Sequence, residues 1–159
     1  MSKKEQKTNV MRLLEQKKIP YAEHTCEDHP STVGSELARF MGEDPKRVFK
    51  TLVTTGKSGE HYVFVIPVDE ELDLKKAASA VGEKAIAMLH QKDLLPLTGY
   101  VHGGCSPIGM KKRFRTVFHR TAADFETIFF SGGKIGCQVE LSLADITPLI
   151  PYELADLIR

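Results

Sequence analysis

Three things that the sequence lacks or has little of limit the class of protein it can encode: it has few cysteines, no long apolar run and almost no net charge. Cys26, Cys105 and Cys137 are odd in number and show no C-x-x-C spacing, so we expect reduced thiols rather than a disulfide framework. The longest uninterrupted apolar stretch, Tyr62 to Pro67, is far short of the roughly 20 residues that span a bilayer. Because no apolar signal core follows the Lys-rich N-terminus, we expect a cytoplasmic protein that makes no membrane contact.

The near balance of charge excludes a protein that attracts polyanions through its overall field. Lys and Arg number 22 and Asp and Glu 21, so any contact with nucleic acid has to come from a local patch. The sequence also lacks repeats, low-complexity tracts and long linkers. At 159 residues it is long enough for a substantial core but too short for two, so we expect one domain over residues 1–159.

Local patterns predict both helices and strands. Val10, Leu13 and Leu14 recur at helical spacing, and Asp73 and Gly82 are a typical helix cap and stop. Helices are expected within residues 4–17, from Ser31 or Thr32 to Met41, from Asp73 to Ala80, and as two C-terminal pieces separated at Pro148 and Pro151. Strands are expected at residues 21–25, 48–54, 61–68, 84–89, 116–119, 127–130 and 136–140.

The order of these elements predicts an α+β fold. Strands outnumber helices in the middle, and only the strand at 84–89 follows a helix of crossover length, so we expect a mixed, largely antiparallel sheet. We also expect this sheet to curl into a barrel with the helices outside. The clearest pattern is a hairpin that joins residues 48–54 to residues 61–68 through Gly56-Lys57-Ser58-Gly59.

One lysine, Lys50, stands inside an apolar strand. Strand alternation puts its side chain on the face of Val48 and Leu52, where an ammonium is costly unless it has a partner. Two interpretations fit. Lys50 is either a charge that protects an edge strand from pairing or the cation of a binding site. The glycine-rich segments farther along the chain favour the second.

Two glycine-rich segments lie in the second half of the chain, at residues 103–109 and 131–136. Glycines let backbone approach a ligand closely and turn N–H groups toward an anionic oxygen, although an ordinary connection between strands is the alternative. Neither segment matches a P-loop or a dinucleotide fingerprint, so nucleotide hydrolysis is not supported. Lys111, Lys112 and Arg113 follow the first segment, either as a solvated surface or as a phosphate-binding cluster.

The sequence offers neither a metal site nor a complete catalytic triad. His24, Cys26 and His29 lie close together but lack a second pair of ligands, so we expect no metal and no cofactor. No Ser-His-Asp order surrounds a nucleophile elbow. A cysteine hydrolase that uses Cys105, with His102 as its base, remains an alternative, although a lone cysteine is more often a small packed residue.

Four motifs in a fixed order resemble the YbaK/EbsC family of aminoacyl-tRNA deacylases. They are V-F-K-T-L-V around Lys50, L-D-L-K-K near residue 74, T-G-Y-x-x-G-G-x-S-P-x-G-x-K-K-R from Thr98 and S-G-G-K-x-G from Ser131. The resemblance implies a small free-standing domain related to the editing domain of bacterial prolyl-tRNA synthetases, with a mixed β-barrel and surrounding helices. Family members nearest this pattern clear Cys-tRNA(Pro), and some clear Cys-tRNA(Cys).

The resemblance also implies a set of site residues. Lys50 matches the family's essential lysine, Thr51 its neighbour in the pocket, Gly103 and Gly104 the loop around the acyl group, and Ser131 the pocket serine.

Further residues are expected to contact the substrate, among them Ser106 and Gly132. The sequence departs from the family at Cys26, where an aromatic residue is common, and at Gln138, where we align an aspartate. Both departures touch the pocket.

The family's chemistry needs no protein nucleophile. The thiol of a cysteinyl ester attacks its own carbonyl, which forms a thiolactone and releases the tRNA, so the protein has only to orient the ester and stabilise the oxyanion. By resemblance, loop amides near Gly103 and Gly104 stabilise that oxyanion, and Lys50 positions the terminal ribose or a phosphate.

The expected partners are Cys-tRNA(Pro), contacted through Lys111, Lys112 and Arg113, and prolyl-tRNA synthetase, which would help to select the tRNA. Two alternatives stay open. One is a deacylase for another small aminoacyl group, such as Ala-tRNA(Pro), and the other is a binding module for tRNA or synthetase without catalysis.

Overall fold

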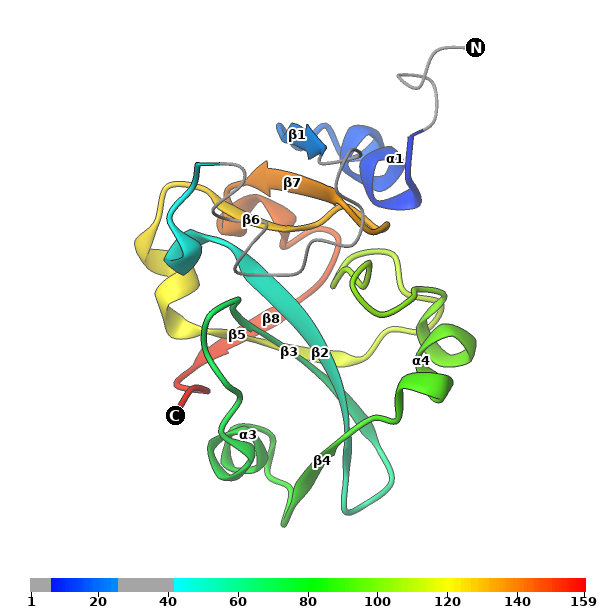
Figure 1. Cartoon of the computed structure of the whole chain (residues 1–159), viewed down its shortest axis with the longest axis vertical. Helices are drawn as coiled ribbons and strands as arrows, with labels where there is room; N and C mark the ends of the chain where they lie inside the picture. Colours follow the sequence, from blue (N-terminus) through cyan, green and yellow to red (C-terminus); the bar gives the residue numbers. More distant parts are fainter. Residues whose placement is uncertain (1–6, 26–41) are drawn as a thin grey trace.

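Two open sheets form the framework of residues 7–25 and 42–159, which the computed structural model describes (Figure 1). The larger sheet has the order β4-β2-β3-β5-β8 and the smaller one the order β1-β7-β6. The strands are β1 (Ala22–Thr25), β2 (Phe49–Gly56), β3 (His61–Pro67), β4 (Ile86–Met88), β5 (Arg115–His119), β6 (Ile128–Ser131), β7 (Cys137–Leu141) and β8 (Tyr152–Ala155). The α-helices are α1 (Asn9–Gln16), α3 (Leu74–Val81) and α4 (Gln91–Thr98). Short 3-10 turns are η2 (Pro45–Arg47), η3 (Arg120–Asp124) and η4 (Leu143–Ile146).

The strand pairing is mixed and largely antiparallel, as predicted, and only the larger sheet contains parallel pairs. In the larger sheet β2 pairs antiparallel with β3 and β4, whereas β5 runs parallel to both β3 and β8. The smaller sheet is antiparallel throughout. The predicted hairpin is confirmed, with Phe49 opposite Pro67 and Thr55 opposite His61. Its turn contains Gly59 at φ +95°, a backbone conformation that favours glycine.

The predicted barrel is wrong for the described part of the chain. There the two sheets stay open and are joined by one isolated parallel bridge, between Val48 and Phe129. A barrel would need a continuous ladder of strands that closes on itself. The start of β2 instead touches β6 and then diverges to pair with β4 from Thr54 onward.

The helices begin and end mostly where their caps predict. Thr8 accepts a hydrogen bond from the Met11 N–H at the start of α1, and Asp73 accepts from the N–H groups of Lys75 and Lys76 at the start of α3. Helix α3 ends at Gly82, whose φ is +75°. The helix expected up to Met41 lies outside the described residues.

The prediction of two C-terminal helical pieces is wrong. The first piece is the 3-10 turn η4, and the second is strand β8, which adds to the edge of the sheet in parallel with β5. Prolines 148 and 151 prevent a long helix there. After Pro151 the chain finds hydrogen-bond partners on β5 instead, with Tyr152 beside Thr116.

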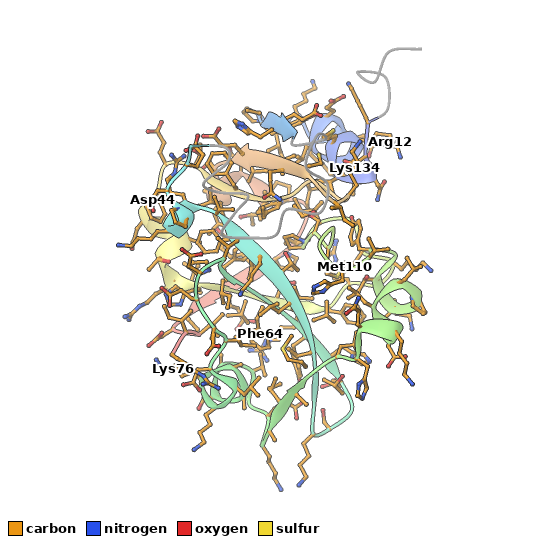
Figure 2. All side chains as sticks on the ribbon, in the orientation of Figure 1. Arg12, Asp44, Phe64, Lys76, Met110 and Lys134 are labelled. Atoms are coloured by element: carbon orange, nitrogen blue, oxygen red, sulfur yellow. The ribbon has the colours of Figure 1, made fainter. Side chains whose placement is uncertain are left out.

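Strand alternation divides the core between the two faces of the larger sheet. Phe49 and Val53 of β2 join the cluster that packs against the smaller sheet and α1. On the opposite face, Phe64 and Ile66 of β3 pack with the buried alanines of α3 (Figure 2). None of the helices in the described ranges is long and apolar enough to cross a membrane.

Candidate active site

The candidate site lies where the two sheets meet. The parallel bridge pairs Val48 with Phe129, so continuing the register by two residues brings Lys50 level with Ser131. Partners in a parallel pair point to the same side. Ser131 is in turn the cross-strand partner of Gln138. Lys50, Ser131 and Gln138 therefore share one face, although they come from three strands.

Lys50 is half-buried and makes no ion pair within the described residues. Burial is the main influence on its pKa and lowers it, while the carboxylates of Glu71, Asp69 and Glu70, after β3, act in the opposite direction. Its backbone lies on the free side of β2, before the pairing with β4 begins at Thr54, so a role in protecting an edge remains compatible with the structure. Protection of a strand edge does not need a buried ammonium. The partial burial of Lys50 suits a binding site for an anionic or polar ligand.

Two polar atoms near this junction are buried without a hydrogen-bond partner in the described chain, Thr51 Oγ1 and Gln138 Oε1. Leaving such an atom unpaired costs about 1–3 kcal/mol, so each is a place where a ligand could supply the missing partner. Gln138 is 6% exposed and lies on the Lys50 face. Thr51 points to the other face of β2, so the structure separates the side chains of Lys50 and Thr51, which the resemblance puts in one pocket.

The two glycine-rich segments contact each other, as expected for parts of one site. A Cβ on Gly104 would lie 3.0 Å from Ile135 N and 3.0 Å from the Lys134 carbonyl carbon. Only glycine allows that approach without a shift of backbone. Gly103, at φ +86°, helps to form the turn that brings the loop there.

Hydrogen bonds within these segments show which donors are already engaged. The Gly104 N–H donates to Val101 O over 2.9 Å and is not free for an oxyanion. The Gly103 N–H makes no hydrogen bond with the described residues. The Ser131 hydroxyl accepts from Gly133 N–H over 3.1 Å and keeps its own hydrogen to donate. Gly132 packs tightly beneath it, because a Cβ there would lie 2.7 Å from the Cys137 sulfur.

Ser106 shapes its loop from the inside. It is fully buried, and its hydroxyl accepts from the Ile108 N–H over 3.3 Å. The same loop is held from outside by the Tyr100 hydroxyl, which donates to Ile108 O. The hydrogen bond of Ser106 thus stabilises its own loop, and the side chain does not point toward the junction of the sheets.

The alternative nucleophile, Cys105, lies in an unsuitable environment. Burial raises the pKa of the Cys105 thiol to about 12, so the thiol stays protonated at neutral pH. His102 is exposed, and no hydrogen bond joins it to Cys105 among the described residues. Cys26 and His29 lie outside the described residues. In the part of the chain that is described, no group of three or more His, Cys, Asp and Glu side chains could hold a metal ion.

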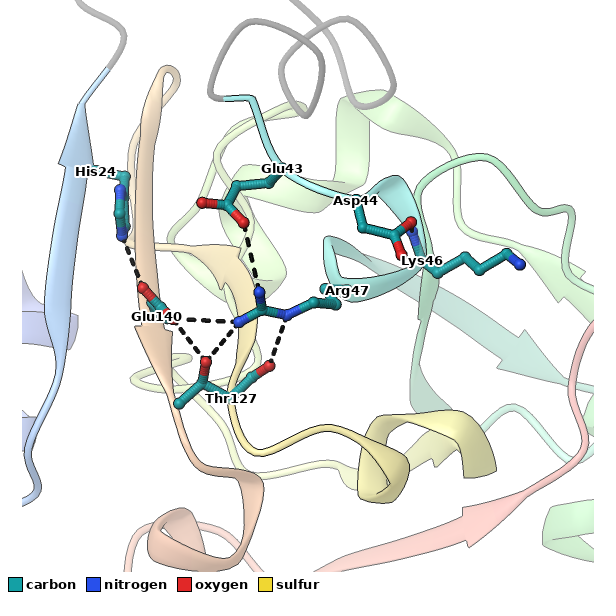
Figure 3. Close-up of polar contacts among 7 residues, drawn as sticks. All are labelled: His24, Glu43, Asp44, Lys46, Arg47, Thr127 and Glu140. Carbon is teal, nitrogen blue, oxygen red and sulfur yellow. Dashed lines mark hydrogen bonds and ion pairs between the residues drawn. The ribbon is translucent and has the colours of Figure 1, made fainter.

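A partly buried network of polar contacts beside the site was not predicted from the sequence (Figure 3). Arg47, three residues before Lys50, donates from Nε to Thr127 O over 3.2 Å and from Nη2 to Thr127 Oγ1 over 2.6 Å. Its Nη2 also donates to Glu140 Oε2 over 3.2 Å. The guanidinium lies 5.1 Å from the ring centre of Phe129, the bridge partner of Val48 just before β2.

Glu140 is the centre of this network. The Thr127 hydroxyl donates to its Oε2 over 2.6 Å, and His24 on β1 lies 3.0 Å from its Oε1. The Thr127 hydroxyl chiefly, and then His24 and Arg47, lower the pKa of this carboxyl. No local pattern could have revealed the network, because its members are separated by up to 116 residues.

The predicted tRNA-binding residues, Lys111, Lys112 and Arg113, are exposed. Arg113 donates to Leu149 O over 3.1 Å, which fixes its direction. Lys112 and Arg113 line a groove of about 340 Å³, whereas the stem of Lys111 lies against Gly99.

Comparison with known proteins identifies the family. The model for the aminoacyl-tRNA editing domain matches residues 28–149. The chain belongs to the aminoacyl-tRNA editing domain family. It is 47% identical over 158 residues to EbsC of Enterococcus faecalis, which is provisionally assigned as a Cys-tRNA(Pro)/Cys-tRNA(Cys) deacylase, and the match covers 98% of this chain and 95% of EbsC. The family predicted from the four motifs is confirmed.

Editing-domain relatives also occur inside larger enzymes. The chain is 31% identical over 78 residues to the proline–tRNA ligase of Pelobacter propionicus, which covers 49% of this chain but 14% of the ligase. Among solved structures, one described as a provisional trans-editing enzyme for prolyl-tRNA synthetase has a TM-score of 0.79 at 22% identity, with 94% of this chain and 96% of that chain covered. Another, of a hypothetical protein, has a TM-score of 0.86 at 20% identity over 96% of this chain and all of that chain. These two likenesses support the fold.

Proposed function

We propose that the chain acts as one deacylase domain that removes cysteine from mischarged Cys-tRNA(Pro) in the cytoplasm, in trans to the synthetase. One observation carries this proposal: a half-buried lysine without an ion pair in the described chain lies level with Ser131 and Gln138, in a member of the editing-domain family. The name of EbsC, a relative over nearly the whole length of both chains, supports cysteine as the acyl group.

The proposed reaction uses the substrate's own thiol. The thiol loses its proton, and its sulfur attacks the ester carbonyl carbon. The bond from that carbon to the terminal ribose oxygen then breaks, and the proton passes to that oxygen. The products are a cysteine thiolactone and tRNA with a free terminal hydroxyl, so atoms balance without a protein nucleophile.

The protein's part is to hold the ester in a reactive geometry and stabilise the negative charge that develops on its carbonyl oxygen. Lys50 positions the terminal ribose or a phosphate. The Gly103 N–H, which has no partner among the described residues, is a better oxyanion donor than the Gly104 N–H, which donates to Val101 O. Ser131 and Gln138 contact the acyl group or its ammonium. The raised pKa of Cys105, about 12, supports a reaction that does not use this thiol.

Selection of the tRNA is proposed to depend on prolyl-tRNA synthetase. Because the chain carries a formal net charge of only +1, its own affinity for tRNA is expected to be weak. Lys111, Lys112 and Arg113 would supply the direct contacts with phosphate.

The test is turnover by the purified protein with a panel of charged tRNAs: Cys-tRNA(Pro), Cys-tRNA(Cys), Ala-tRNA(Pro) and Ser-tRNA. We expect the cysteinyl substrates to be cleared fastest and addition of synthetase to favour tRNA(Pro). Preferred clearance of Ala-tRNA(Pro) would identify a deacylase of different specificity. Binding of tRNA without turnover of any substrate would overturn the proposal in favour of a non-catalytic module.

A further inference from the structure

A groove of about 340 Å³ lies on the protein surface away from the β2–β6 junction. It is lined by α1, by the end of the first glycine-rich segment with the residues that follow it, and by the connection to β8; Met110, one of these residues, is labelled in Figure 2. Its lining includes Leu13, Lys17, Met110, Lys112, Arg113 and Phe114.

The charge of this groove is of one sign. Lys17, Lys112 and Arg113 contribute three cations, and none of its described lining residues is acidic. The chain as a whole is nearly neutral, with 22 basic and 21 acidic residues, so this excess is local. A cationic groove in a neutral protein is complementary to a short run of phosphates.

Apolar side chains form much of the remaining wall. Leu13, Met110, Phe114 and Leu149 are partly buried hydrophobic residues that pack on the core and line the groove. Cationic grooves lined by aromatic and apolar side chains suit single-stranded nucleic acid, because unpaired bases stack on the apolar surface while the cations follow the backbone. The volume is within the usual range for small-ligand sites, roughly 300–1,000 Å³, and matches a nucleotide better than a duplex.

Contacts within the protein hold the walls of the groove together. Arg113 crosses from one wall to the other through its bond to Leu149 O, over 3.1 Å. Gly109, at φ +80°, fits closely against α1, since a Cβ there would lie 2.8 Å from the Tyr100 hydroxyl and 2.9 Å from Asn9 Nδ2. Such preorganisation reduces the entropy lost on binding.

The groove is joined to the candidate active site through one continuous loop. The segment 107–110 begins three residues after Gly104, and Gly104 packs on the Lys134–Ile135 backbone just beyond Ser131. We therefore expect a ligand that reaches both places to follow this loop.

We propose that this groove binds the unpaired nucleotides that precede the terminal adenosine of the tRNA, with Lys17, Lys112 and Arg113 on their phosphates. The inference rests on the proposed function. It adds Lys17, the residue that caps the end of α1, which no sequence motif indicates, and it distinguishes Lys112 and Arg113 in the groove from Lys111 outside it.

The test compares two triple variants that lose the same charge. Lys17→Gln/Lys112→Gln/Arg113→Gln removes the cations of the groove, and Lys57→Gln/Lys75→Gln/Lys84→Gln removes three exposed lysines from the hairpin turn, α3 and the segment before β4. For uncharged tRNA we expect the log–log salt slope of the groove variant to fall by about two, at about 0.7 per lost single-strand phosphate contact. The slope of the control should stay at the wild-type value. Equal losses in the two variants would overturn the assignment.

Substrates of increasing length separate this inference from the proposed function. Aminoacyl-adenosine fills only the active site, so the groove variant should cleave it at the wild-type rate. A cysteinyl tetranucleotide with the terminal unpaired sequence should show a KM about tenfold higher in the groove variant than in the control. If the penalty is confined to full tRNA, the groove contacts the acceptor stem and the single-strand assignment is wrong.

If the wild-type protein cleaves none of these esters, the proposed function is refuted. The salt dependence of tRNA binding by the two triple variants would still test whether the groove binds phosphates. An abasic tetranucleotide that retains only its terminal adenosine checks the role of the bases. It should bind the wild-type protein roughly tenfold more weakly than the complete tetranucleotide. Equal binding would exclude base stacking.

Discussion

Arg47 donates to Glu140 over 3.2 Å and thereby ties the residues just before β2, which carries Lys50, to β7, which carries Gln138. The two residues are 93 positions apart. The contact spans the same junction as the Val48–Phe129 bridge, so the spacing of the candidate site depends on it.

Glu140→Gln should destabilise the fold, because it removes a charge that accepts hydrogen bonds from Arg47 and Thr127 in a partly buried setting. We expect a loss of about 1–3 kcal/mol in the free energy of unfolding at pH 7, measured by urea titration. The double variant Arg47→Met/Glu140→Gln should lose less than the sum of the two single variants. Additive losses would show that the two side chains are not coupled.

The same pair predicts a pH dependence. The folded-state pKa of Glu140 is lowered, chiefly by the Thr127 hydroxyl, so its stabilising contribution is present above the unfolded-state pKa and is lost as pH falls through the folded value. Subtracting the stability of Glu140→Gln from that of the wild-type protein should give a difference that shrinks below about pH 5. A difference that stays constant down to pH 3 would contradict this assignment.

Lys50→Ala should lower kcat/KM for Cys-tRNA(Pro) by at least about 100-fold, the scale of losing one well-placed electrostatic group. The fold should persist, because burial lowers the pKa of Lys50 and the charged ammonium is therefore not a stabilising group. Lys57→Ala in the hairpin turn is the matched control. Near-normal turnover by Lys50→Ala would show that Lys50 is not the cation of the active site. Its role would then be to protect an edge strand from pairing.

Gln138→Leu should lower kcat/KM roughly tenfold or more while leaving the melting temperature unchanged or higher. The reason is that Gln138 Oε1 is buried without a partner in the described chain, so removing it relieves the folded state but deprives the substrate of an acceptor. Thr121 Oγ1, in η3 and away from the junction of the sheets, is another atom buried without a partner in the described chain. Thr121→Val should therefore change the melting temperature as Gln138→Leu does, but it should keep full activity. Equal activity of the two variants would place Gln138 outside the substrate contacts.

Cys105→Ala should retain most activity, because a thiol with a pKa of about 12 contributes little thiolate at neutral pH. Cys-tRNA should in turn be cleared much faster than Ser-tRNA, since the attacking group belongs to the substrate. Trapping of cysteine thiolactone, and failure of S-alkylated Cys-tRNA to react, would be the chemical evidence. Loss of activity in folded Cys105→Ala, with free cysteine as the first product, would favour the cysteine hydrolase.

Local signals predicted the parts of the fold that local physics decides. The β2–β3 hairpin follows from glycines between two β-rich runs, and α3 follows from the Asp73 cap and the Gly82 stop. Helix α4 was not predicted, because Pro96 lies within it and His90 gives it no side-chain cap. Strand β8 was missed because its identity comes from hydrogen bonds to β5, which no local pattern contains.

Some features of the candidate site could likewise be predicted from local sequence, and others depend on the tertiary fold. The position of Lys50 in β2 and the contact between the glycine-rich segments were accessible from sequence, because unusual residues mark both. Strand alternation alone separated Thr51 from Lys50, and only the resemblance joined them. The Arg47–Glu140 contact, by contrast, joins ordinary charged residues whose meeting is a product of the tertiary fold.

The junction of the sheets determines how far apart Lys50 and Ser131 lie. Within the described chain the sheets are joined there by a single bridge, and Val48, Val68 and Phe129 form a small cluster of their own around it. A closed barrel would fix the distance between Lys50 and Ser131 by a ring of backbone hydrogen bonds. Here that distance depends on three apolar side chains and on the Arg47–Glu140 contact, so we expect the width of the site to respond to the volume of the side chain at position 68, beside the bridge.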